Sequence, residues 1–271
     1  MRLILSRKGF DSKYGGFPSP ILEDGTLLSV PIPDKNGRRL DELRPRGVNL
    51  AEIVADLTRG KVRAAQTVHL DPDLDYTSVP RERAWVPAFG QASNAGRHLD
   101  REGVDLEDVF LFFGWFREVE KRAGKWHYVP KAPNLHVLFG WLRVGRKILE
   151  GECAVPEAIK DHPHFDPVDR PYNRVYVAQS LHDGGIFPKF LPVLQLTDSN
   201  VSRSIWRLPS WFHPDRHPAL TYHRNPKRWE LGNGNDSTQL RSVARGQEFV
   251  LDTSYYPEAE QWIKDLLTRA A

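Results

Sequence analysis

The sequence predicts an α/β (α+β) fold: a single domain over residues 1–271, built on a mixed, partly barrel-like β-sheet with flanking helices. Three observations support it. Most apolar runs are short and end at glycine or proline, which is typical of strands. Near the C-terminus an apolar stripe repeats with the period of a helix. No linker or low-complexity stretch divides the 271 residues, a length that suffices to bury a core.

Strands are expected where β-branched and aromatic residues gather between turn residues. The first is expected over residues 2–6. The run over 27–33 is typical of an edge strand, because its prolines donate no ladder hydrogen bond. Further strands are expected over residues 64–70, 126–128, 174–178, 192–196 and 247–252, and an aromatic segment broken by proline spans 204–212.

Three helices are expected. The first covers residues 49–57, with Asn49 as N-cap and Gly60 beyond its end. The second covers 93–99. The third is C-terminal, with Pro257 at its first position. Its apolar stripe consists of Ala259, Trp262, Ile263, Leu266 and Leu267.

One pentapeptide pattern occurs twice, as Phe-Gly-Trp-Phe-Arg at 113–117 and as Phe-Gly-Trp-Leu-Arg at 139–143. Each copy ends an apolar run, so two paired strands are expected. Trp115 and Trp141 are candidates to stack on a nucleobase, worth ~1–3 kcal/mol per base, with Arg117 and Arg143 toward phosphate. Alternation leaves both faces of the first strand largely apolar, so core packing explains the repeat equally well.

Composition limits the class of protein. The formal charge of +3 and the pI near 8.9 permit contact with phosphate without demanding it. The single cysteine, Cys153, excludes an internal disulfide and is expected to be a buried, inert thiol. No apolar run approaches the ~18 residues of a membrane span. A cytoplasmic protein with no membrane partner is expected.

Several common enzyme signatures are missing from the sequence. It contains no P-loop, no G-x-G-x-x-G, no H-E-x-x-H, no deaminase motif and no nucleophile elbow. The common kinase, dehydrogenase, zincin and hydrolase classes are therefore disfavoured.

The segment that follows the first strand could bind a nucleotide. Arg7 and Lys8 would favour a phosphate, and Asp11 could position a sugar hydroxyl or a metal. Glycine at a strand end lets a ligand approach the backbone closely. Tyr14, Gly15 and Gly16 extend this candidate site. A solvated turn with its charges outward is the alternative.

His69, Asp71 and Asp73 alternate along the chain, so an extended backbone would place all three on one face. The two carboxylates, Asp71 and Asp73, could hold Mg²⁺ or Mn²⁺, the candidate cofactors. The group could equally supply a general base. An exposed acidic turn is the alternative.

Two further segments carry polar candidates. Gln91 precedes a stretch of small residues and could read the edge of a base. A surface helix start explains it equally well. His162-Pro163-His164 has no partner at metal-ligand spacing, so it is interpreted as a loop and not as a site.

Several of these segments together resemble the nucleotide modification associated domain family, type 3. The resemblance covers nearly the whole chain and rests on residues 5–11, 14–16, 18–20, 69–73, 110–117 and 245–252. It implies association with bacterial and phage systems that hypermodify DNA bases, marks the matching residues as candidates and assigns no catalytic role. A fold-level analogy to PUA-like barrels rests on residues 108–112 and 142–145.

The resulting expectation is a protein that acts on a nucleotide or a modified base, with nucleotide or DNA and the other enzymes of a modification system as partners. His69, Asp71, Asp73 and Asp11 are the catalytic candidates. The alternatives are a non-catalytic, PUA-like reader of modified bases in DNA and a scaffold subunit of a modification system.

Overall fold

The structure, a computed structural model, describes residues 1–12, 15–152, 155–166, 170–199, 201–215, 217–232 and 236–270. Its helices are α1 (Leu50–Leu57), α2 (Ser93–Arg101) and α3 (Glu258–Ala270). Its strands are β1 (Arg2–Arg7), β2 (Ser19–Ile21), β3 (Pro33–Arg39), β4 (Thr67–Val68), β5 (Ala88–Gln91), β6 (Val109–Arg122), β7 (Lys125–Tyr128), β8 (Leu135–Arg143), β9 (Arg146–Leu149), β10 (Arg174–Val177), β11 (Gly184–Ile186), β12 (Ile205–Pro209), β13 (Trp229–Leu231), β14 (Ser237–Arg241) and β15 (Glu248–Asp252).

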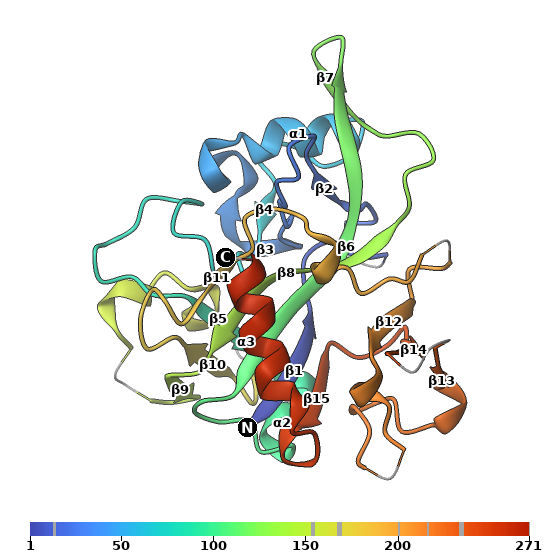
Figure 1. The fold of residues 1–271 in the computed structure, drawn as a ribbon. Helices are drawn as coiled ribbons and strands as arrows, with labels where there is room; N and C mark the ends of the chain where they lie inside the picture. The colour runs from blue at the N-terminus through green and yellow to red at the C-terminus, as the bar shows by residue number, and fades with distance from the viewer. Residues whose placement is uncertain are drawn as a thin grey trace.

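The main sheet runs in the order β11-β8-β6-β1-β15, with β2 and β7 also paired to β6. Strand β1 is parallel to β6 and antiparallel to β15, so the sheet is mixed. Leu3, Ile4 and Leu5 are fully buried, as expected for a central strand covered on both faces. Helix α3 crosses one face of this sheet (Figure 1) and packs Ala259, Ile263 and other apolar residues into its core.

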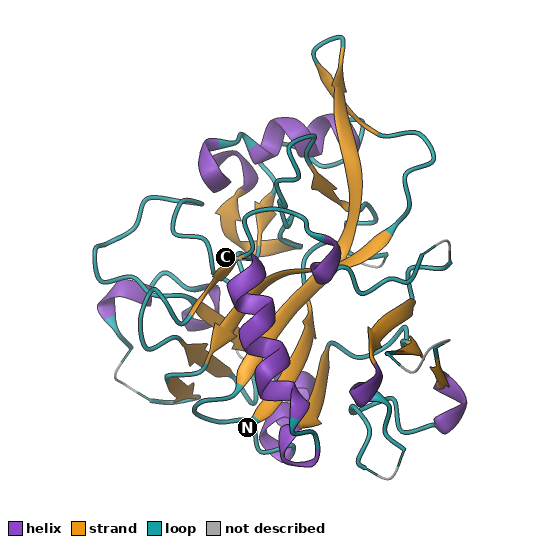
Figure 2. Cartoon of the chain, viewed as in Figure 1, coloured by secondary structure: helices purple, strands orange, loops and turns teal. Residues whose placement is uncertain are grey.

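Smaller sheets surround the main one. They have the orders β5-β10-β9, β12-β14-β13 and β3-β4, and loops connect them to the main sheet and to the helices (Figure 2). The α+β class is confirmed. The main sheet is open and no barrel closes among the described strands, so "partly barrel-like" describes it only loosely.

Most of the predicted elements are confirmed. Strand β1, strand β15 and the three helices form where expected, and the Asn49 side chain caps α1 by accepting from the Glu52 N–H at 3.4 Å. Two strand predictions are wrong. Residues 192–196 begin with a 3₁₀ turn over Pro192–Leu194. Residues 27–33 form only an isolated bridge before β3 begins at its final residue.

The repeated pentapeptides lie on paired strands, as predicted. Strands β6 and β8 are antiparallel, with Phe112 opposite Gly140. A Cβ on Gly114 would lie 3.0 Å from the Lys8 carbonyl oxygen, and one on Gly140 would lie 2.9 Å from that of Gly185. The bare backbone at both glycines therefore accommodates a neighbouring segment of the protein itself.

In the ranges given above, no helix is both long enough and apolar enough to cross a membrane.

Candidate functional site

A cavity of about 200 Å³ lies at the end of β1, and we call it the β1 pocket. It brings together polar side chains from segments that are far apart in the sequence. Its walls consist of Arg7, Lys8, Gly9, Asp11, Ile32, His69, Asp71, Gln91, His164 and Gln247. Six of the predicted site residues are therefore in one place, joined by His164.

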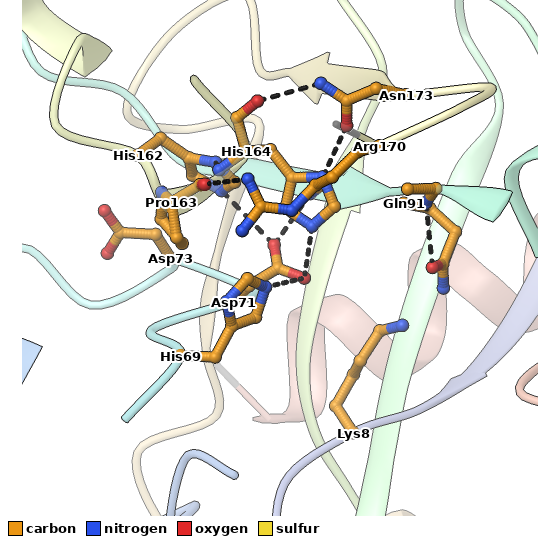
Figure 3. A network of polar contacts seen from close by, with 12 residues as sticks. Lys8, His69, Asp71, Asp73, Gln91, His162, Pro163, His164, Arg170 and Asn173 are labelled. Atoms are coloured by element: carbon orange, nitrogen blue, oxygen red, sulfur yellow. Dashed lines mark hydrogen bonds and ion pairs between the residues drawn. The ribbon is translucent and has the colours of Figure 1, made fainter. Parts of the chain in front are cut away.

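Asp71 is the centre of the polar network in this pocket (Figure 3). Its Oδ2 lies 4.0 Å from His69 Nε2 and 3.9 Å from His164 Nε2. Its Oδ1 accepts a hydrogen bond from the Gly90 N–H at 2.7 Å and lies 3.2 Å from His162 Nε2. The Asp71 side chain is only 6% exposed, so three imidazoles surround a buried carboxylate.

The electrostatics of this network keep Asp71 ionised. Burial alone would raise the Asp71 pKa, but the His162 hydrogen bond and the nearby imidazoles outweigh burial and lower that pKa below its usual value. Burial lowers the pKa of His164 to about 4, although Asp71 opposes this. At neutral pH the pocket thus holds a carboxylate beside a neutral His164 imidazole.

Both imidazoles that face Asp71 Oδ2 through Nε2 have a polar partner at their other ring nitrogen, Nδ1. His69 Nδ1 lies 2.9 Å from the Asp34 carboxylate, and His164 Nδ1 lies 2.6 Å from Asn173 Oδ1. The Asn173 amide also donates through Nδ2 to the His164 carbonyl at 2.8 Å. That second bond fixes which end of the amide faces the ring, because only Nδ2 can donate.

The backbone makes room for this arrangement. The segment that carries His164 is anchored by Arg170, whose Nη1 donates to the Pro163 carbonyl at 2.8 Å. A Cβ on Gly90 would lie 2.2 Å from His164 Cγ. Only glycine at this position of β5 lets the His164 ring lie against the strand while the Gly90 N–H reaches Asp71.

His69, Asp71 and His164 form a group that could hold a metal ion, since one ligand atom from each lies within 4.8 Å of the others. Asp73 does not join them. Its side chain is buried, forms an ion pair with Arg81, faces Trp85 Nε1 at 3.4 Å and points away from Asp71 (Figure 3). Burial raises the Asp73 pKa, with Arg81 opposing.

In the opposite wall of the β1 pocket, Lys8 and Gln91 both contact the buried carboxylate of Glu248. Lys8 Nζ lies 2.7 Å from Glu248 Oε1, with the two side chains 8% and 0% exposed. Gln91 Nε2 donates to the same oxygen at 2.6 Å, and Gln91 Oε1 accepts from the Ala92 N–H. The Lys8 ammonium also lies 4.3 Å from the centre of the Phe89 ring. Lys8 and Gln91 are thus held in fixed positions.

A second cavity of about 700 Å³ adjoins the first, and Arg7 and Asp11 line both. We call it the Trp115 groove. The Arg7 guanidinium donates to the carbonyls of Val243 and Ala244 at 2.8 and 2.9 Å. Burial lowers the Arg7 pKa and Asp11 opposes this. Arg7 is therefore a partly buried cation in the wall between the two cavities.

Trp115 and Arg203 form the aromatic part of the groove. Arg203 Cζ lies 4.0 Å from the Trp115 ring centre, and its guanidinium donates to the Ser12 hydroxyl. Trp115 Nε1 donates to Asn134 Oδ1 at 2.8 Å. One face of the Trp115 ring is therefore already covered by a guanidinium, which itself can stack on a base.

The other candidates that the structure describes lie outside both cavities. Arg117 donates to the Val129 carbonyl at 3.0 Å, and Trp141 packs against the main core. Arg143 pairs with Val109 at the end of the sheet opposite to Arg7. Gly15 and Gly16 have φ of +83° and +75°, in the turn after Asp11. Tyr14 and Cys153 lie outside the described residues.

Sequence reasoning missed His162, His164 and Gly90. The interpretation of 162–164 as a segment with no ligand partner is corrected for His164, because the fold brings it to Asp71. The partner is more than 90 residues away, so no spacing rule finds it. One signal in the sequence could have marked this segment. Pro163 lies between His162 and His164, and because proline restricts the backbone, both imidazoles can be held in defined positions.

Comparison with known proteins supplies the family. A search of curated proteins and of solved structures gave no match to this chain. The family model described as "Nucleotide modification associated domain 3" matches residues 2–252, which include every residue that lines the two cavities. The resemblance noted from the motifs is thereby confirmed, and the chain belongs to the nucleotide modification associated domain 3 family.

Proposed function

We propose that this protein is an enzyme that acts on a nucleotide or a modified base, and that the β1 pocket is its reaction centre. One observation carries the proposal: His69, Asp71 and His164 meet in a single cavity beside Lys8 and Arg7. A reader of modified bases requires cationic and aromatic surfaces. A carboxylate buried among three imidazoles is costly to build and is typical of reaction centres.

The pocket supplies acceptors of protons or cations. Asp71 is ionised and His164 is neutral at neutral pH because of the pKa shifts described above. Such groups can deprotonate a bound nucleophile or coordinate an ion that does so. Lys8 lies in the wall of the same pocket, where its charge is paired with Glu248.

The volumes of the two cavities indicate which part of a nucleotide each could hold. The β1 pocket, at about 200 Å³, is smaller than the ~300–1,000 Å³ of typical ligand sites. The adjoining groove has about 700 Å³. We therefore place the reacting part of the substrate in the pocket. The rest lies in the groove, with Arg7 and Arg203 toward phosphate and the Trp115–Arg203 stack toward a base.

The test is Asp71→Asn in a cell that carries the complete modification system. Nucleosides from digested DNA are separated and identified by mass spectrometry. Loss of the modified nucleoside is expected, with His127→Gln as a control because His127 is an exposed histidine on β7. A modified-nucleoside content equal to that of the wild type would contradict the catalytic role.

The Trp115 groove also suits a non-catalytic reader, the alternative function. Titration with modified and unmodified oligonucleotides at several salt concentrations separates the two. A reader would bind the modified oligonucleotide more tightly, and Asp71→Asn would leave that preference and the modification itself unchanged. Equal affinities with a purely electrostatic salt slope would count against a reader.

A further inference from the structure

Three potential ligand atoms converge in the β1 pocket: one each from His69, Asp71 and His164. His69 Nδ1 faces a carboxylate of Asp34, which only accepts when ionised, so the proton of a neutral His69 lies on Nδ1. His164 Nδ1 faces Asn173 Oδ1, whose orientation is fixed by its second bond. Both Nε2 atoms therefore present lone pairs to Asp71 Oδ2. A cation placed between the three atoms would be within reach of all of them.

The two oxygens of Asp71 have different surroundings. Oδ1 receives the Gly90 N–H and lies beside His162 Nε2, whereas Oδ2 faces only the two Nε2 atoms among the contacts that the structure describes. Metal-binding histidines usually donate their other ring N–H to a carboxylate or a carbonyl, and ligating carboxylates are themselves hydrogen-bonded. Asp34, Asn173 and Gly90 supply these outer partners.

We propose that His69, Asp71 and His164 bind one divalent first-row transition-metal ion through Nε2, Oδ2 and Nε2. Bonds of ~2.1 Å place neighbouring ligands ~3.0–3.5 Å apart. The distances of 4.0 and 3.9 Å to Asp71 Oδ2 therefore have to shorten by roughly 0.5–1 Å when the ion binds.

The ligand set decides the class of ion. Two imidazoles and one carboxylate suit Mn²⁺, Fe²⁺, Co²⁺ or Zn²⁺, whereas Mg²⁺ and Ca²⁺ prefer oxygen ligands alone. Asp73 is unavailable to the centre because Arg81 holds it. Three protein ligands leave positions open, which is typical of catalytic and not of structural sites. Lys8 and Gln91 line the same cavity as the three ligands. The ion would serve the reaction proposed above, but its binding is measured without that reaction.

The experiment uses the full chain, stripped of metal with a chelator and titrated with Co²⁺. Binding is followed by visible absorption and by calorimetry. One equivalent is expected, with a spectrum typical of mixed nitrogen and oxygen ligands and with no competition from an equal concentration of Mg²⁺. Asp71→Asn keeps the shape of the side chain and is expected to weaken binding by at least ~100-fold.

Two further variants make the result decisive. His164→Gln is expected to weaken binding as Asp71→Asn does, and it replaces that variant if circular dichroism shows that the latter is unfolded. His127→Gln, which removes an exposed imidazole, is expected to leave binding unchanged. Failure of the wild type to bind Co²⁺, Mn²⁺, Fe²⁺ or Zn²⁺ at micromolar concentration would overturn the proposal. So would binding that neither ligand variant weakens.

Different experimental results would contradict the proposed metal centre and the proposed function. If the ion binds as expected but DNA modification does not depend on Asp71, the metal site stands and the catalytic role falls. If modification depends on Asp71 but no ion binds, the catalytic role stands and the metal centre falls.

Discussion

The β1 pocket and the Trp115 groove share a wall but differ in how their side chains are held. In the pocket, the side chains of Asp71 and His164 are each only 6% exposed, and each is fixed by at least one internal partner. In the groove, Trp115 and Arg203 are half-buried and lie beside exposed residues such as Asn134. Fixed groups suit chemistry, which depends on sub-ångström placement. Partly exposed cationic and aromatic groups suit recognition of a larger, variable ligand. The predictions below test this division.

The largest effect is expected in the pocket wall, from Lys8→Met. The Lys8–Glu248 pair is almost fully buried, and removal of one partner of such a pair costs about 3–5 kcal/mol of unfolding free energy. Urea denaturation measures the loss. The double variant Lys8→Met/Glu248→Gln is expected to recover part of it.

The control for this prediction is Lys160→Met, which breaks an exposed pair with Glu157 and is expected to leave the urea midpoint unchanged. Equal midpoints for the wild type and Lys8→Met would show that the pocket wall is not fixed by this pair.

Gly90→Ala is expected to disrupt the centre of the pocket without a change of charge. The added methyl group would lie 2.2 Å from His164 Cγ, so the ring has to move. We expect Co²⁺ affinity to fall ~10–100-fold, as when an outer partner of a metal ligand is lost. Gly185→Ala is the matched control, because a Cβ at that strand glycine meets no atom within 4 Å. Unchanged Co²⁺ affinity in Gly90→Ala would refute the packing argument.

In the groove, Arg203→Ala is expected to weaken nucleotide binding and to leave the Co²⁺ affinity unchanged. Loss of a stacking surface costs ~1–3 kcal/mol, so affinity for a deoxynucleoside monophosphate should fall ~10-fold in calorimetry. Arg207→Ala, at an exposed arginine on β12, is the control. A fall in Co²⁺ affinity in Arg203→Ala would show that the groove and the pocket are one unit.

The smallest effect concerns His136, a buried histidine that lines the groove. Burial lowers its folded-state pKa from 6.5 to about 3, and its Nδ1 accepts from Trp206 Nε1 at 2.9 Å, so the folded protein favours the neutral ring. Because the folded pKa lies below the unfolded one, the stability is present above pH 6.5 and is lost as the pH falls. The slope reaches ~1.4 kcal/mol per pH unit per histidine.

His136→Asn should therefore reduce the loss of stability between pH 7.5 and pH 5.5 by ~1 kcal/mol, measured by urea denaturation at each pH. An identical pH dependence in the wild type and the variant would contradict a neutral, buried His136.

Local patterns in the sequence predict local features of this protein well. The Asn49 cap, the stripe of α3 and the apolar run of β1 each depend on neighbours within a few residues. The failure at 192–196 has a local cause too, since a run that starts with proline also suits the 3₁₀ turn that forms there.

The candidate site is less accessible to such reasoning. Alternation along the strand predicts that His69 and Asp71 lie together, and both line the β1 pocket. The same rule predicts that Asp73 joins them, but its carboxylate forms a separate buried ion pair with Arg81. His164 and Gly90 reach Asp71 only through long-range packing. Contacts between distant segments depend on the whole fold, and no spacing within one segment encodes them.

Strand β1 lies between β6, which begins at residue 109, and β15, which ends at residue 252. During synthesis, residues 2–7 therefore leave the ribosome well before their partner strand β15 does. The delay is on the order of 10–50 s at ~5–20 residues per second. Until then one edge of a strand with an apolar centre, Leu3 to Leu5, is open to other chains. Lys8 and Gln91 likewise lack Glu248 during that interval. A nascent chain that stops before residue 248 would leave this edge of β1 unpaired and would lack the Glu248 contacts in the wall of the β1 pocket.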